Sequence, residues 1–256
     1  MGFIVAFQKY HLIKPPIFVG FANFKNIFYD PLTSIVFKNT LYYTALSLAL
    51  TFLVPIFVAI LLMEMKKSTI RIMMILWFIP IAGMASLVIW KCVDTLFPIT
   101  FNGILTTLGL PTLRWLEDIR IVMLCLVLPG LIMYGPGLIY IASLQGIPDE
   151  FYEAAELEGA GFWRKVWSIT LPRLRPIIAM MLILAVINNM QIFNRPFVMT
   201  GGGPGDATRT VVMRYYNLAF EQMKFGRGQT LAFLLFILLI ILIIIQRKYF
   251  KENPDV

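Results

Sequence analysis

Long apolar runs separated by short polar segments dominate the chain. Five charge-poor runs lie at about 40–63, 72–90, 121–145, 176–194 and 229–245. Each is close to the length of about 20 residues that crosses the hydrocarbon core of a bilayer. Backbone groups in lipid must form their hydrogen bonds internally, and these runs lack the alternation of barrel strands, so they predict helices. The pattern predicts an all-α, polytopic membrane bundle of about five spans in a single domain, 1–256.

Composition supports a membrane protein and excludes several classes of function. Hydrophobic residues make up 59% of the chain and charged residues 14%, whereas a soluble domain carries about 25% charged residues. The net charge of +8 does not indicate nucleic acid, because basic residues commonly flank spans. Cys92 and Cys125 fall in or beside apolar runs, which favours two buried thiols over a disulfide or metal pair. With His11 as the single histidine, we expect no metal site, no catalytic site and no cofactor.

The two ends of a five-span chain lie on opposite sides of the membrane. Placing the polar loop 146–175 in the cytoplasm leaves ten of the 22 basic residues inside, so the raw count does not choose a side. Basic residues are nevertheless dense in the short loop after the first run and directly after the last run. The positive-inside rule therefore favours a cytoplasmic C-terminus.

The loop between the third and fourth runs carries a polar helix–turn–helix pattern. Pro148 and the acids after it suit the first turn of a helix, and Gly159 can end that helix. A helix on the bilayer surface is the alternative, but such helices favour basic residues over acids. The acids and the small pair Ala154–Ala155 fit insertion into a groove of a partner protein. No phosphate-binding Gly-x4-Gly-Lys-Ser/Thr string occurs in the chain, so we expect it to be no ATPase itself.

Residues Glu153-Ala154-Ala155, Gly159 and Ile169-Thr170-Leu171-Pro172 resemble, at full spacing, the EAA loop of binding-protein-dependent ABC importer permeases. The segments 18–24 and 200–205 are similar to the maltose, multiple-sugar and glycerol-phosphate branch of that family. The resemblance implies the type I importer permease fold, with the family's usual first span missing from this chain. It implies a multi-pass protein of the cell (inner) membrane, a component of a sugar transport complex.

The resemblance also implies a mechanism and partners. The loop at about 147–175 would be a cytoplasmic coupling helix that sits in a cleft of a separate ATPase. Glu153 would pair with a basic group there, and ATP and Mg²⁺ would bind the ATPase. The expected partners are a second permease subunit, two ATPase subunits, an extracytoplasmic solute-binding protein and the lipid bilayer. The coupling residues are Glu153, Ala154, Ala155, Gly159, Ile169, Leu171 and Pro172.

Polar residues inside the runs are candidates for a solute pathway. In the fourth run, amide side chains can both donate to and accept from a hydroxyl-rich solute, although bonding between helices explains them equally well. In the first run Thr40, Thr44, Ser47 and Thr51 share one helical face, for which helix packing is the stronger reading. A break near Gly135–Pro136 in the third run could line a cavity. The pathway candidates are Asn188, Gln191, Asn194, Tyr134, Tyr140 and Ser47.

Two other classes of function remain open. An ion-coupled secondary transporter needs ionisable groups at mid-membrane, and no Asp or Glu lies deep in the five runs. A membrane scaffold without transport would explain the loop but not the polar fourth run. We therefore expect one half of the translocation pathway for a di- or oligosaccharide, driven by a separate ATPase.

Overall fold

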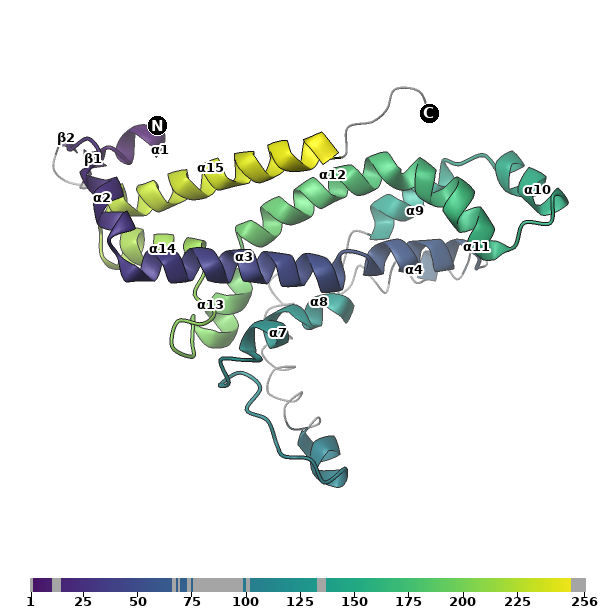
Figure 1. Cartoon of the computed structure of the whole chain (residues 1–256), viewed down its shortest axis with the longest axis horizontal. Coiled ribbons are helices and arrows are strands. Elements are labelled where there is room, and N and C mark those ends of the chain that lie inside the picture. The colour runs from purple at the N-terminus through teal and green to yellow at the C-terminus, as the bar shows by residue number, and fades with distance from the viewer. Residues whose placement is uncertain are drawn as a thin grey trace.

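The described part of the chain is almost entirely helical. The computed structural model describes residues 2–10, 15–65, 68, 70–72, 75, 99, 102–132 and 137–249. Within these residues, strand structure is confined to the antiparallel pair β1 (Gln8–Lys9) and β2 (Ile17–Phe18), in which Gln8 faces Phe18. The prediction of an all-α bundle is confirmed. Its long helices run side by side along the long axis of the molecule (Figure 1).

The first apolar run forms two helices in sequence, α3 (Pro31–Thr51) and α4 (Val54–Met63). Asp30 caps α3 by accepting the Leu32 amide at 3.0 Å, which satisfies a donor that the first turn leaves open. Pro55 lies at the start of α4. Proline lacks an amide hydrogen and crowds the preceding turn, so it accounts for the interruption at 52–53. The predicted run at 40–63 is therefore confirmed, with a start at Pro31 and a break.

Two further stretches are long and apolar enough to cross a membrane: Phe162–Thr200 and Phe225–Lys248, beside Pro31–Met63. The first contains α12 (Leu171–Met190) and α13 (Asn194–Thr200), and the second is α15 (Phe225–Tyr249). The prediction of one continuous helix over 176–194 is wrong at its end. Gln191 caps α12 with φ −101°, and α13 starts after this turn.

The third run is divided into α7 (Val122–Val127), α8 (Pro129–Ile132) and α9 (Gly137–Gln145). The predicted run at 121–145 is helical over most of its described residues, with an interruption at Leu128 between α7 and α8. The break expected near Gly135–Pro136 lies outside the described residues. So does the predicted run at 72–90, apart from Ile72 and Ile75.

One end of the bundle gathers the N-terminal elements and the segment after α13 (Figure 1). These elements are α1 (Gly2–Val5), α2 (Ala22–Phe28), α14 (Val211–Tyr216) and the π-helical turn η3 (Asn217–Glu221). The segment 195–228 thus contains short helices between the longer spans. Gly201 ends α13 with φ +60°, a conformation that suits glycine.

The opposite end carries α10 (Glu150–Leu157), α11 (Phe162–Lys165) and the π-helical turn η2 (Val166–Thr170). The C-terminal end of α15 also points toward this end, where Gln246 donates to the Ala179 carbonyl at 3.2 Å. A buried core joins α4, α9 and α12 to the base of the loop, with Tyr140 and Leu174 among its members. The loop is therefore built on packed spans.

Candidate functional site

The segment 150–170 forms a hairpin, called the coupling hairpin below. Acids in the first turn of α10, Glu150 and Glu153, lie at the positive end of the helix dipole. Gly159 adopts φ +76°, which costs an L side chain roughly 1–2 kcal/mol. The Ala160 amide donates to the Ala155 carbonyl at 2.9 Å and closes the turn. The sequence therefore reverses direction where its glycine allows it.

The outer face of α10 is open. Glu153 and Ala154 are exposed, and the Leu157 side chain is 92% exposed. The acids Glu150 and Glu158 are exposed on either side. An apolar side chain ringed by acids suits a partner surface with an apolar recess and basic groups at its edge.

The remaining coupling candidates hold the hairpin to the bundle. Ile169 and Leu171 are half-buried and pack against the core that contains Val166 and Leu174. Pro172 lies in the first turn of α12, where a missing amide hydrogen costs nothing. The predicted set thus separates into an exposed part on α10 (Glu153, Ala154, with Ala155 half-buried), a turn residue (Gly159) and an anchoring part (Ile169, Leu171, Pro172).

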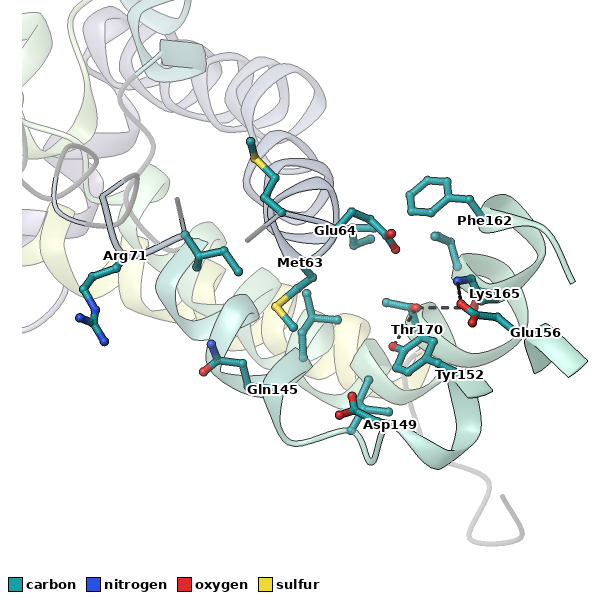
Figure 2. Close-up of a pocket in the computed structure, with 16 residues that line it drawn as sticks. Met63, Glu64, Arg71, Gln145, Asp149, Tyr152, Glu156, Phe162, Lys165 and Thr170 are labelled. Atoms are coloured by element: carbon teal, nitrogen blue, oxygen red, sulfur yellow. Dashed lines mark hydrogen bonds and ion pairs between the residues drawn. The ribbon is translucent and has the colours of Figure 1, made fainter. Parts of the chain in front are cut away.

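A cavity of about 670 Å³ lies between the hairpin and the ends of α4 and α9. Figure 2 shows Glu64 from the end of α4 and Lys165 from the hairpin among its lining side chains. Within the cavity wall, Lys165 bonds Glu156 at 2.7 Å, and the Tyr152 and Thr170 hydroxyls lie 3.1 Å apart. Sequence reasoning missed these groups, because no local signal links residues on two separate helices.

The predicted pathway residues fall into two groups. Asn188, Gln191 and Asn194 are exposed, and Met180 and Leu184 continue the same exposed side of α12. In contrast, Tyr140 is 1% exposed and Ser47 4% exposed, so both face the interior of this chain. Tyr134 lies outside the described residues. Asn188 and Gln191 thus lie on one exposed side of α12, and Asn194 is exposed at the start of α13, whereas Tyr140 and Ser47 are buried.

The hydroxyls of the first run lie on one buried face of α3. Thr40, Thr44 and Thr51 each donate to the carbonyl four residues earlier at 2.7–2.8 Å. The Thr40 oxygen also accepts the Val211 amide at 3.0 Å, which ties α3 to α14. The face predicted from the sequence exists and is buried, and its bonds favour the packing reading.

Among the described residues, cysteine and metal chemistry give no further candidate site. Cys125 is buried and its thiol donates to the Trp115 carbonyl at 3.2 Å, while Cys92 and His11 lie outside the described residues. In the part of the chain that the structure describes, no three His, Cys, Asp or Glu side chains are grouped to hold a metal ion. The features left to explain are an exposed acidic hairpin, a polar open face on α12 and a bundle of spans.

These features define a multi-helix membrane protein with an exposed acidic hairpin at one end, and comparison with known proteins gives its family. The model of the binding-protein-dependent transport system inner membrane component matches residues 56–250. The chain belongs to this family of ABC importer permeases, as its motif predicted. It is a membrane subunit of a transport system.

A curated relative and two solved structures extend the likeness over most of the chain. The sulfoquinovosyl glycerol transport system permease protein SmoG of Agrobacterium fabrum is 30% identical, over 88% of this chain and 74% of its own length. A crystal structure of a bacterial ABC transporter that imports the acidic polysaccharide alginate matches with a TM-score of 0.84 and 20% identity, over 99% of this chain and 88% of that chain. The same kind of transporter, in complex with a periplasmic protein bound to alginate pentasaccharide, matches with a TM-score of 0.78 and 20% identity, over 90% and 82%. The fold is that of a type I importer permease.

Proposed function

We propose that the chain forms one half of the translocation pathway of an ATP-driven carbohydrate importer. The observation that carries this proposal is the coupling hairpin, which presents Glu153 and Leu157 to the outside at one end of the spans. The transport of sulfoquinovosyl glycerol by SmoG and of alginate by the structural relative supports a sugar or oligosaccharide as the solute.

The partners follow from the same proposal. A second permease subunit covers the open face of α12, and two ATPase subunits bind the coupling hairpins. ATP and Mg²⁺ bind these ATPases, and this chain carries no cofactor of its own. An extracytoplasmic binding protein delivers the solute, as the periplasmic protein of the alginate transporter complex suggests.

The coupling hairpin faces the cytoplasm in this proposal, and so does the C-terminus. Arg247 and Lys248 close α15 at the end that Gln246 ties to α12, and Arg173 and Arg175 are exposed near the start of α12. This gathering of basic residues fits the positive-inside rule. A cysteine in place of Lys248 should react with a membrane-impermeant maleimide only in inside-out vesicles. Labelling in right-side-out vesicles would reverse the orientation.

An ion-coupled secondary transporter finds less support. Among the described residues of 31–63, 162–200 and 225–248, no Asp or Glu occurs, and ion coupling usually needs acids at mid-membrane. A scaffold without transport leaves the exposed amides of α12 unexplained.

The substitution Glu153→Lys tests the docking role. It reverses the charge of an exposed side chain and should leave membrane insertion intact, while co-purification with the ATPase should fall at least tenfold because like charges then meet. Glu117→Lys, at an exposed acid in the segment between α4 and α7, is the matched control and should change nothing. Unchanged co-purification of Glu153→Lys would remove Glu153 from the docking surface.

A further inference from the structure

Three contacts cross the coupling hairpin at three levels. Near the turn, Lys165 Nζ lies 2.7 Å from Glu156 Oε1. In the middle, the Tyr152 and Thr170 hydroxyls are 3.1 Å apart. At the base, the Arg173 guanidinium lies 3.7 Å above the centre of the Phe151 ring, a cation–π contact. The hairpin is therefore held together along its length by side chains outside the set of coupling residues predicted from the sequence.

These contacts fix how α10 is rotated about its own axis. Tyr152 and Glu156 are four residues apart and share one face of α10, and both point toward η2 and α11 (Figure 2). Glu153 follows Tyr152 by one residue and Leu157 follows Glu156 by one residue, so Glu153 and Leu157 share a second face of α10. A step of one residue turns a helix by about 100°. The contacts of Tyr152 and Glu156 therefore set the direction in which Glu153 and Leu157 point.

The Glu156–Lys165 ion pair, called the latch below, links α10 to α11. The Lys165 side chain is only 15% exposed, whereas that of Glu156 is 61% exposed. Lys165 and Glu156 line the same cavity as Glu64 of the α4 end, and the two acids stand on opposite sides of the ammonium group in Figure 2. A mostly buried cation is restrained more than one in an exposed ion pair. The Lys165–Glu156 pair therefore joins the two arms of the hairpin to each other, and Glu64 at the end of α4 lines the cavity beside them.

We propose that Glu156 and Lys165 are positioning residues for ATPase coupling, which hold α10 in the rotation that presents Glu153 and Leu157 to the ATPase. The latch raises affinity by preorganisation, because an unlatched hairpin must be ordered again each time the partner binds. It also gives the hairpin the stiffness to pass a displacement from the ATPase to α4 and α12. This inference rests on the proposed function.

Charge exchange separates the latch from a general role in stability. The full chain is placed with its partner permease in lipid nanodiscs, and binding of the purified cognate ATPase subunit is measured by biolayer interferometry. Glu156→Lys and Lys165→Glu should each raise the Kd about tenfold, since each places like charges together. The double exchange should lower the Kd below that of either single variant without full recovery, because the exchanged carboxylate at position 165 shares its cavity with Glu64. Lys165→Arg alone should stay within about threefold of the original Kd. Arg175→Met, at an exposed cation beside the hairpin, is the control and should keep the original Kd.

A second readout covers variants that fold poorly. Amide hydrogen exchange of the peptide 150–158 should rise in both single variants and fall again in the double exchange, while the peptides of α15 stay unchanged. The proposed positioning role of Glu156 and Lys165 is wrong if the double exchange binds no better than the worse single variant. It is also wrong if the single variants bind like the original chain. If the original chain itself shows no ATPase binding, the proposed function fails first and the latch fails with it.

Discussion

The guanidinium of Arg214 donates a hydrogen bond of 2.6 Å to the carboxylate of Asp30, 184 positions away in the sequence. The bond joins α14 to the start of α3 at the end of the bundle opposite the coupling hairpin. Both side chains are largely buried, at 13% and 25% exposed. Burial alone would raise the pKa of Asp30. Bonds from Arg214 and from the Leu32 amide, with the charges of Arg214 and Arg227, outweigh it and lower the pKa below its ordinary value.

Asp30→Asn should lower the free energy of unfolding by about 1–3 kcal/mol, because hydrogen bonds to charged groups are worth about that much. The lowered pKa adds a pH dependence. The contribution is complete above the unfolded pKa of about 3.9 and is lost as pH falls through the lower folded pKa. The melting temperature of the original chain should therefore approach that of Asp30→Asn below about pH 4.

Thermal unfolding in nanodiscs between pH 3 and 7 checks this expectation. Glu117→Gln removes an ion pair between Arg114, whose side chain is 84% exposed, and Glu117, whose side chain is 73% exposed. It should change the melting temperature little. A gap between the original chain and Asp30→Asn that stays constant down to pH 3 would show that the carboxylate charge is not what stabilises this contact.

Gly159→Ala should weaken ATPase binding while the spans stay folded. A methyl group there meets no atom within 4 Å, so the cost comes from the backbone at φ +76°. About 1–2 kcal/mol of strain reduces the population of the turn by a factor of about 5 to 30. The loss should appear as an equal rise in the Kd for the ATPase.

Gly161→Ala is the matched control for this turn. Gly161 has φ −69°, which any residue adopts, and a methyl group there also meets nothing within 4 Å. It should bind the ATPase as the original chain does. Equal effects of the two substitutions would mean that the positive φ of Gly159 does not shape the docking surface.

Asn188→Leu and Gln191→Leu should raise the KM for solute about fivefold each, with ATPase docking unchanged. Each removes an exposed amide from the open side of α12, and a hydrogen bond to a sugar hydroxyl contributes about 1 kcal/mol. Asn189→Thr is the control, because the Asn189 amide already bonds the Ala185 carbonyl at 2.8 Å and threonine can keep a bond to that carbonyl. Uptake assays with the sugar that the binding protein binds measure the KM of each variant and of the original chain. An unchanged KM would place the solute path elsewhere.

The sequence was sufficient to predict the helical class and the position of the coupling loop. Apolar runs must be helices in lipid, and the spacing from Glu153 to Pro172 is local. The same reasoning found the turn at Gly159, since glycine adopts a positive φ at no steric cost. These features depend on residues close together in the chain.

The features that were missed depend on contacts between separate elements. The break between α12 and α13 consists of Gln191, Ile192 and Phe193, which a hydropathy pattern does not distinguish from a continued helix. The interruption before α4 follows from Pro55, whose missing amide hydrogen a hydropathy pattern does not register. The bonds Lys165–Glu156 and Arg214–Asp30 carry no spacing signal, and the buried state of Tyr140 and Ser47 follows from packing.

The most direct test of the account is transport by the reconstituted complex. Proteoliposomes that contain this chain, its partner permease and the ATPase subunits should take up a radiolabelled sugar only when the binding protein is on the solute side and ATP is on the ATPase side. Uptake should stop with a hydrolysis-deficient ATPase and be insensitive to an imposed proton or sodium gradient. Uptake by this chain alone, driven by such a gradient and without ATP, would contradict the account.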